Sequence, residues 1–346
     1  MTTKDLKKKQ LLGIAAVKPR HYHFDEELVQ ADLLFEGGTS PVVLTPKTER
    51  VALGEWLPGN KSFLTGKLHQ AGALLFRNFN LNSLEDFRNF GTSLGCQFME
   101  YEHRSSPRSE MATNIYTSTD YPPAYAIKMH TEQSYSDDWP TKLLFYCVQP
   151  PGAGGQTPIA DCRGLLQRLN PATVQQFEQK GVMYVRNLTG RPELGLTWQE
   201  VFQTDDPQRV VQECRRTNIH YQWGDDQRLR LQWVRPALRL HPHTGERVWF
   251  NHAYFFHALS YPDLVLEMVN GEDELPFCTY YGDGTRIEES VIREIEAAYQ
   301  QSVIEFDWQK GDVLVVDNML MAHGRKPFEG ARKIAVLMVD AYSRTG

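Results

Sequence analysis

The sequence runs Val313-Leu314-Val315-Val316 and then, after a polar break, Ile334-Ala335-Val336-Leu337-Met338-Val339. Uninterrupted apolar runs of this kind are typical of strands in a sheet that is covered on both faces. Similar runs predict further strands at 70–79, 142–148, 156–160, 182–185 and 249–251, whereas helices are expected at 83–95 and 163–180. Many strands with few helices predict a mainly β fold, a double-stranded β-helix (jelly roll) core with flanking helices.

The domain organisation is expected to be simple, because no linker divides residues 1–346 into two parts. Residues 190–235 are polar and rich in Arg, Gln, Asp and Trp, and they are expected to form an insertion or lid on this single domain. In the helix predicted at 163–180, Asp161 is the expected N-cap and Gly181 the expected stop.

The composition excludes several classes of protein. The net charge of −6 gives no sign of a nucleic-acid partner, and no apolar run approaches the length of a membrane span. Five cysteines without a CxxC spacing indicate reduced thiols in a cytoplasmic protein. The lysine-rich residues 4–9 and the short apolar segment 11–17 are expected to be a solvated end rather than a signal peptide.

A metal site is predicted from His130-Thr131-Glu132 together with a distant His323. On an extended strand residues i and i+2 point to the same side, so His130 and Glu132 are expected to face one cavity while Thr131 faces away. Two imidazoles and one carboxylate form the facial triad of non-haem Fe(II) oxygenases, which leaves coordination positions open. The pattern HxE alone occurs often by chance, so it needs support from other residues.

Two further features supply that support. Arg332 follows His323 by nine residues at the start of the last apolar run, and its guanidinium suits bidentate pairing with a dicarboxylate such as 2-oxoglutarate. Arg325 is the competing arginine, and it can instead tie down a loop. Thr157, in Gly154-Gly155-Gln156-Thr157-Pro158, offers a hydroxyl to the same carboxylate, although it is also an ordinary β-branched strand residue.

These motifs together resemble the TauD/TfdA superfamily of Fe(II)- and 2-oxoglutarate-dependent dioxygenases, from about residue 70 to the C-terminus. The nearest resemblance is to the SyrP-like branch found in nonribosomal peptide biosynthesis. The phrases that carry it include Tyr116-Thr117-Ser118-Thr119-Asp120-Tyr121-Pro122, Met129-His130-Thr131-Glu132-Gln133-Ser134-Tyr135, Trp139-Pro140, Phe145-Tyr146-Cys147 and His323-Gly324-Arg325.

The resemblance implies that His130, Glu132 and His323 hold Fe(II), and that Thr157 and Arg332 bind the distal carboxylate of 2-oxoglutarate, with O2 as the second co-substrate. Many relatives carry a second arginine four positions after the first, where this chain has Val336, so Arg332 is expected to act either alone or with help from Arg325. Related halogenases have a small residue at the position of Glu132, so hydroxylation is expected rather than halogenation. Desaturation or cyclisation by the same oxidant stays open.

The expected substrate is an amino acid or a derivative of one, either free or tethered to a carrier protein. Arg104, Arg108, Tyr116 and Tyr135 are candidates to frame its pocket, and so is Asn251 with its neighbour His252; surface arginines are an equally good interpretation of the first two. His241-Pro242-His243 imitates a pair of metal ligands, but the following Thr244-Gly245 favours a turn.

Two other classes of protein remain as alternatives. A zinc-dependent hydrolase also uses two histidines and a glutamate, but the sequence has no HExxH helix, and this class leaves Thr157 and Arg332 unexplained. A non-catalytic jelly-roll binding module with a coincidental triad is the second alternative. Binding of Fe(II) separates it from an oxygenase, and dependence on 2-oxoglutarate separates the oxygenase from the hydrolase.

Overall fold

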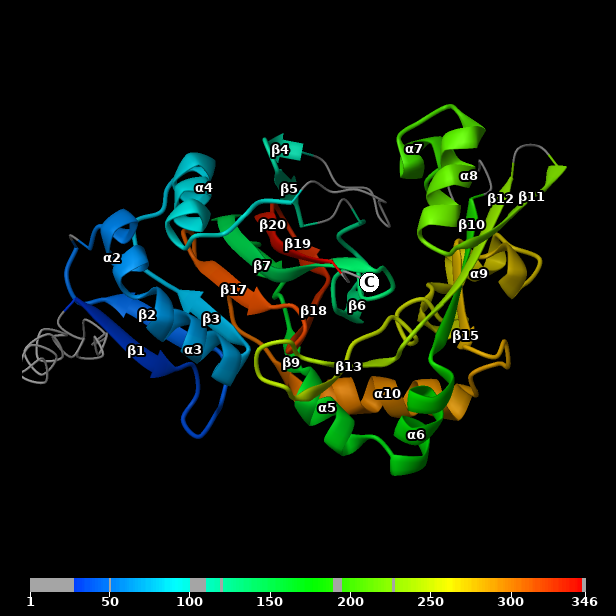
Figure 1. Cartoon of the computed structure of the whole chain (residues 1–346). Helices are drawn as coiled ribbons and strands as arrows, with labels where there is room; N and C mark the ends of the chain where they lie inside the picture. Colours follow the sequence, from blue (N-terminus) through cyan, green and yellow to red (C-terminus); the bar gives the residue numbers. More distant parts are fainter. Residues whose placement is uncertain are drawn as a thin grey trace, which may run out of the picture.

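A computed structural model describes residues 28–49, 51–99, 110–118, 121–188, 195–225 and 228–343. Its largest element is a sheet of eight strands in the middle and on the β1 side of the molecule (Figure 1). The strand order is β1 (Val29–Leu33), β2 (Val42–Pro46), β3 (Ala73–Phe76), β17 (Val313–Asp317), β7 (Asp138–Gln149), β20 (Lys333–Ser343), β5 (Ile115–Thr117) and β4 (Glu110–Ala112). All neighbours pair antiparallel except β2 and β3, which are parallel.

Side chains along the central strands alternate between two hydrophobic cores. In β7, Leu143 and Phe145 belong to the core on the inner face of the large sheet, whereas Leu144 and Tyr146 belong to the core on its outer face. Successive residues of a strand point to opposite faces, so a sheet that is covered on both sides needs apolar residues at every position. The same alternation in β17 and β20 confirms the prediction that the two apolar runs lie in a doubly covered sheet.

A smaller sheet faces the inner side of the large one. Its order is β16 (Val303–Ile304), β9 (Ile159–Asp161), β18 (Met321–Arg325) and β6 (Ile127–His130). The two sheets meet where the ring of His323 in β18 lies 5.2 Å from the ring of Phe145 in β7. A short pair, β8 (Ala153–Gly154) with β19 (Phe328–Glu329), joins neighbouring loops. Two facing sheets with helices outside them form the predicted jelly roll.

Helices α2 (Leu53–Gly59), α3 (Lys61–Ala71) and α4 (Leu84–Ser93) cover the outer face of the large sheet (Figure 1). The predicted helix at 83–95 is α4, and Ser83 caps it through a reciprocal capping box with Asp86. The strand predicted at 70–79 is shorter than expected. Helix α3 continues to Ala71 and ends at Gly72, whose φ of 76° lies in the left-handed region that favours glycine, so β3 begins at Ala73.

The prediction of one helix over 163–180 was wrong, because two helices occupy this region. They are α5 (Cys162–Arg168) and α6 (Pro171–Lys180), and they are separated where Pro171 lacks an N–H group and disfavours a helical residue before it. The expected caps are confirmed: Asp161 accepts hydrogen bonds from two backbone N–H groups of α5, and Gly181 ends α6. Helix α10 (Glu289–Ser302) packs beside α5 (Figure 1).

A third sheet stands beside the jelly roll in the order β11 (His220–Trp223), β12 (Leu229–Arg235), β10 (Val182–Leu188) and β15 (Phe277–Tyr281) (Figure 1). Around it lie α7 (Trp198–Phe202), α8 (Pro207–Arg216), α9 (Asp263–Glu267) and the 3-10 helices Ala258–Ser260 and Glu272–Glu274. The hairpin β13 (Leu238–Leu240) and β14 (Arg247–Trp249) leads back to the jelly roll. The strand expected at 249–251 was wrong for its last two residues, because β14 ends at Trp249. The expected insertion at 190–235 contributes β11 and β12 to this sheet, which also includes strands on either side of it.

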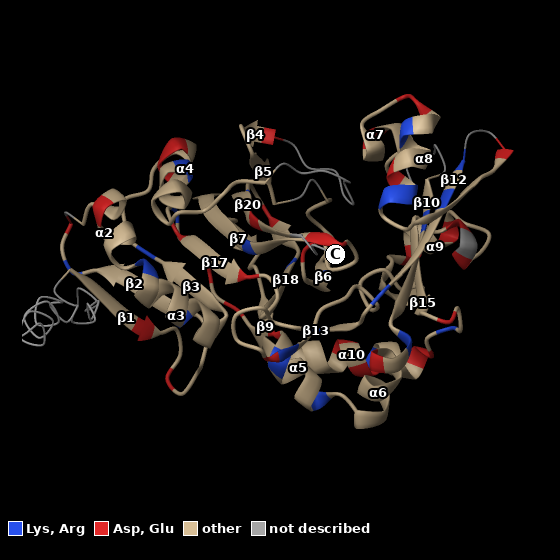
Figure 2. Cartoon of the chain, in the orientation of Figure 1, with Lys and Arg blue, Asp and Glu red and all other residues tan. Residues whose placement is uncertain are grey.

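Charges of both signs are interspersed over the helices and loops, while the central strands are largely uncharged (Figure 2). Among the described residues, the helices are all too short or too polar to cross a membrane.

Candidate active site

Three side chains that the sequence singles out meet between the two sheets of the jelly roll. His130 is the last residue of β6, and it lies opposite His323 of β18 in their antiparallel pairing. Glu132 follows in the turn after β6, not in a strand, and its side chain is buried. One ligand atom from each of these residues lies within 4.8 Å of those of the other two. The structure therefore brings the three expected metal ligands together.

The ring of His130 is oriented by the strand that carries it. Its Nδ1 atom lies 2.9 Å from the backbone carbonyl oxygen of Lys128. A carbonyl oxygen only accepts, so Nδ1 carries the ring proton and Nε2 keeps its lone pair for a metal ion. The rings of His130 and His323 lie with their centroids 4.3 Å apart. This donor set, two imidazole nitrogens and a carboxylate oxygen, fits Fe(II) with open coordination positions.

The triad lines a cavity of about 280 Å³. The large sheet contributes Leu143, Phe145 and Val336 to its wall. Three phenylalanines form much of the opposite side: Phe255, whose ring lies 4.6 Å from that of His130, and the stacked pair Phe256 and Phe277. Mostly apolar walls with a few polar groups are typical of a small-molecule site.

Arg332 and Thr157 lie together in the wall of the same cavity. The guanidinium of Arg332 donates to the Gly155 carbonyl oxygen at 2.8 Å, and to the hydroxyl oxygens of Ser118 and Thr157 at 3.2 Å each. Within the part of the chain that the structure describes, no carboxylate pairs with it. Burial, with a smaller contribution from Arg325, lowers the pKa of Arg332 to about 10. A half-buried cation in this setting favours an anionic ligand.

The hydroxyl of Thr157 is prepared to donate. Its oxygen accepts from Arg332 and also from the indole Nε1 of Trp308, at 3.1 Å. A hydroxyl oxygen has two lone pairs and one proton, so these two bonds leave the proton as the group that can bond to a ligand. Arg332 and Thr157 thus present N–H and O–H donors that suit a carboxylate in the cavity.

Arg325 lines the cavity but directs its donors elsewhere. It donates to the backbone carbonyl oxygens of Tyr121, Pro122 and Tyr125, at 2.7–2.8 Å. Burial lowers the pKa of Arg325 as well. These contacts hold residues 121–125 against β18, so the geometry favours Arg332 over Arg325 as the partner of a carboxylate.

The expected substrate residues are scattered. Tyr116 and Tyr135 are buried in the inner core, and neither lines the cavity; the ring of Tyr135 packs edge-on against His252, 4.9 Å away. Asn251 does not line the cavity either, because its amide donates to the Ala237 carbonyl oxygen and accepts from the N–H of Ala253. Arg104 and Arg108 fall outside the described residues.

His252 lines the cavity and is buried. Its Nδ1 lies 2.7 Å from the hydroxyl oxygen of Ser134, and its ring centroid is 5.8 Å from that of His130. Burial, followed by the proximity of His130, lowers the pKa of His252 well below its usual range. It therefore remains a neutral wall residue next to the triad, outside the group of expected ligands.

Sequence reasoning missed residues that distant segments bring to the site. Asn318 hydrogen-bonds both backbone groups of Glu132, although 186 positions separate the two residues. Arg186 of β10 lines the far wall of the cavity with its guanidinium over the ring of Phe277. The one available signal was the Asp317-Asn318 pair at the end of an apolar run, a position typical of residues that bond to backbone groups.

Comparison with known proteins agrees with this site and fold. The family model described as "Taurine catabolism dioxygenase TauD, TfdA family" matches residues 40–339. The match spans most of the chain, and the protein therefore belongs to the TauD/TfdA family of dioxygenases and is an enzyme. The expected family and fold class are confirmed.

Two curated proteins are similar to this chain. The dapdiamide synthesis protein DdaC of Enterobacter agglomerans is 39% identical over 276 residues, which cover 79% of this chain and 83% of that protein. A clavaminate synthase-like protein of Arabidopsis thaliana is 26% identical over 336 residues, which cover 94% of this chain and 98% of that protein.

Solved structures share the fold at low sequence identity. PvcB from Pseudomonas aeruginosa, described as an Fe, alpha-ketoglutarate dependent oxygenase from an isonitrile synthetic pathway, superposes with a TM-score of 0.53 at 15% identity, covering 92% of this chain and 94% of PvcB. AAD-2, determined in complex with Mn(II) and N-oxalylglycine, superposes with a TM-score of 0.54 at 14% identity, covering 91% of this chain and 98% of AAD-2.

Proposed function

We propose that this protein is an Fe(II)- and 2-oxoglutarate-dependent dioxygenase that hydroxylates an unactivated C–H bond of an amino acid or an amino-acid-derived substrate. The observation that carries the proposal is the content of one cavity. It holds His130, Glu132 and His323 within 4.8 Å of one another, and in the same wall a half-buried arginine, Arg332, that pairs with no carboxylate among the described residues. A zinc hydrolase would use the triad but would give Arg332 and Thr157 no role.

The residues divide the work of binding. His130, Glu132 and His323 would hold Fe(II), and Arg332 with Thr157 would hold the distal carboxylate of 2-oxoglutarate. When bound together, Fe(II), 2-oxoglutarate and O2 supply an oxidation in which one oxygen atom enters the substrate C–H bond and the other enters succinate, with release of CO2. The apolar ring of Phe255, which lies against His130, would exclude water around the reacting groups.

Glu132 favours hydroxylation over halogenation, because its carboxylate occupies the position that a halide would need. Desaturation and cyclisation use the same binding residues. The products separate these outcomes by mass: hydroxylation adds one oxygen atom to the substrate, whereas desaturation and oxidative ring closure each remove two hydrogen atoms.

An amino-acid-like substrate in specialised metabolism is supported by two relatives. DdaC is described as a dapdiamide synthesis protein, and PvcB as a member of an isonitrile synthetic pathway. A cavity of about 280 Å³ suits a small molecule. The substrate is either free or presented by a carrier protein. The insertion at 190–235 is the place proposed for contact with that carrier. Succinate release with free amino acids, compared with their carrier-bound forms, distinguishes the two versions.

The proposed activity is tested by anaerobic visible spectroscopy. Fe(II) and then 2-oxoglutarate are added to the wild type, to His130→Ala and to Arg332→Met. We expect a metal-to-ligand charge-transfer band in the wild type, none in His130→Ala, and a band in Arg332→Met only at much higher 2-oxoglutarate concentration. Absence of the band in folded, iron-loaded wild type would remove the dioxygenase proposal.

A further inference from the structure

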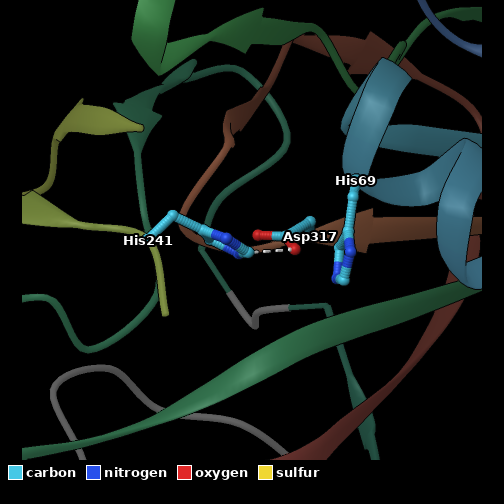
Figure 3. A group of neighbouring side chains, drawn as sticks. All are labelled: His69, His241 and Asp317. Atoms are coloured by element: carbon cyan, nitrogen blue, oxygen red, sulfur yellow. Dashed lines mark hydrogen bonds and ion pairs between the residues drawn. The ribbon is translucent and has the colours of Figure 1, made fainter. Parts of the chain in front are cut away.

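A second cluster of metal-binding side chains lies outside the cavity. His69 is in the last turn of α3, His241 follows β13, and Asp317 ends β17. One ligand atom from each lies within 4.8 Å of the other two, the same criterion that the catalytic triad meets. Figure 3 shows the carboxylate of Asp317 between the two imidazole rings. His241 and Asp317 are buried, and His69 is half-buried, which leaves a path from solvent.

We propose that His69, His241 and Asp317 form a second binding site, for a divalent cation of the zinc type, that joins three separate segments of the fold. Two imidazole nitrogens and one carboxylate oxygen are ligands that Zn(II) takes in tetrahedral sites, with water or a further side chain as the fourth. The site is separate from the cavity that binds substrate, so this inference does not depend on the proposed reaction.

His69 is ready to act as a ligand. Within the described part of the chain, neither nitrogen of its ring makes a hydrogen bond, although the ring lies 5.4 Å from that of His241. His243 stacks on His69, with ring centroids 5.2 Å apart, and places a third imidazole beside the site.

His241 must change its proton position when a cation binds. Its Nδ1 accepts from the N–H of Thr244 at 3.1 Å, so the ring proton is on Nε2 and is donated to Asp317 at 3.1 Å. Coordination through Nε2 requires that lone pair, so the proton moves through solvent to Nδ1. The N–H groups of His243 and Thr244, which both donate to Nδ1, then turn away. The turn 242–245 is largely exposed, which keeps this rearrangement local.

The cluster is mechanically linked to the catalytic site. The second oxygen of Asp317 accepts from the N–H groups of Met319 and Leu320, which shapes the turn between β17 and β18. Asn318, which follows Asp317 in this turn, holds the backbone of Glu132. A cation on Asp317 would therefore stiffen the turn that positions one catalytic ligand, using α3 and the β13–β14 hairpin as anchors.

Zinc binding to a chain that lacks the catalytic ligands tests the proposal. In the background His130→Ala/His323→Ala, Zn(II) retained after dialysis against a weak chelator is measured by elemental analysis. We expect close to one equivalent per chain and a rise in melting temperature with Zn(II). Adding His69→Ala should lower the affinity for Zn(II) by roughly tenfold or more, because one of three protein ligands is lost.

Two controls keep the result decisive. His220→Ala, an exposed histidine on β11, should leave zinc retention in the same background unchanged. His69→Gln, with circular dichroism of every variant, separates loss of a ligand from loss of fold. Equal retention with and without His69, or no retention in the double variant while it is folded, would overturn the second site and leave His241 and Asp317 as a hydrogen-bonded pair.

Discussion

Asn318 holds Glu132 by both of its backbone groups. Its Oδ1 accepts from the N–H of Glu132 at 2.7 Å, and its Nδ2 donates to the carbonyl oxygen of Glu132 at 2.9 Å. The same Nδ2 donates to the carbonyl oxygen of Pro140 at 2.8 Å, which ties the turn of Glu132 to β7. One fully buried amide therefore sets the position of a carboxylate ligand that lies in a turn rather than in a strand.

Asn318→Ala should weaken Fe(II) binding by about 10- to 100-fold, because residues that orient metal ligands contribute on that scale. The free energy of unfolding should fall by about 1–3 kcal/mol, since the backbone groups of Glu132 lose buried partners. Fe(II) titration followed by the charge-transfer band measures the first effect, and thermal melting of the metal-free protein measures the second.

Asn251→Ala is the matched control for this change. Asn251 is also buried and also bonds to two backbone groups, those of Ala237 and Ala253, but it does not touch a triad residue. It should lose stability to a similar extent and keep its affinity for Fe(II). If both variants lose metal binding equally, the effect of Asn318 is general destabilisation and not positioning of Glu132.

Arg332→Lys should raise the KM for 2-oxoglutarate by roughly thirtyfold or more, about 2 kcal/mol, while kcat at saturation changes less. Lysine keeps the charge but loses the planar fork that bonds to Gly155, Ser118 and Thr157 and that suits a carboxylate. Steady-state succinate formation at varied 2-oxoglutarate measures both constants.

Arg325→Lys serves as the comparison, because Arg325 directs its donors to the carbonyl oxygens of residues 121–125. It should reduce thermal stability and change the KM for 2-oxoglutarate much less than Arg332→Lys does. The reverse order of the two KM values would assign the co-substrate to Arg325.

Thr157→Val should raise the KM for 2-oxoglutarate by about 10- to 100-fold, since a hydrogen bond from a hydroxyl to a charged carboxylate contributes about 1.5–3 kcal/mol. Valine has nearly the same shape as threonine but cannot donate or accept. Thr157→Ser keeps the hydroxyl and should restore most of the affinity. A serine variant as weak as the valine variant would mean that the methyl group, and not the hydroxyl, is what matters at this position.

The sequence predicted what local periodicity encodes. The apolar runs at β17 and β20 were recognisable because a sheet that is covered on both faces needs apolar residues at every position. The neighbouring strand β7 shows the same requirement, since Leu143 and Leu144 pack into different cores. His130 and Glu132 were paired by the alternation of a strand, but the strand ends at His130 and Glu132 reaches the site from the turn after it. Thr157 and Arg332 were recognisable from the donors that their side chains offer and through resemblance, and the structure places a guanidinium nitrogen of Arg332 3.2 Å from the hydroxyl oxygen of Thr157.

Contacts between distant segments could not be predicted in this way. Asn318 and Asn251 are both asparagines near strand ends, and sequence alone gives no reason to prefer one at the site; the direction of each turn decides it. Arg186 reaches the cavity only because the third sheet stands beside the jelly roll. The break between α5 and α6 is different, since Pro171 signals it locally.

Phe255→Ala should increase consumption of 2-oxoglutarate in the absence of substrate. The ring of Phe255 lies 4.6 Å from that of His130 and shields one side of the triad, so its removal admits water to the place where substrate belongs. The charge-transfer band formed with Fe(II) and 2-oxoglutarate should remain, because neither is held by this ring. Succinate formed without added substrate measures the effect.

Phe256→Ala is the contrasting variant. Phe256 is buried and stacked on Phe277, with ring centroids 3.9 Å apart, so its loss should mainly lower the free energy of unfolding, by about 3–5 kcal/mol. An unchanged rate of succinate formation in Phe255→Ala would mean that this ring does not guard the triad from water.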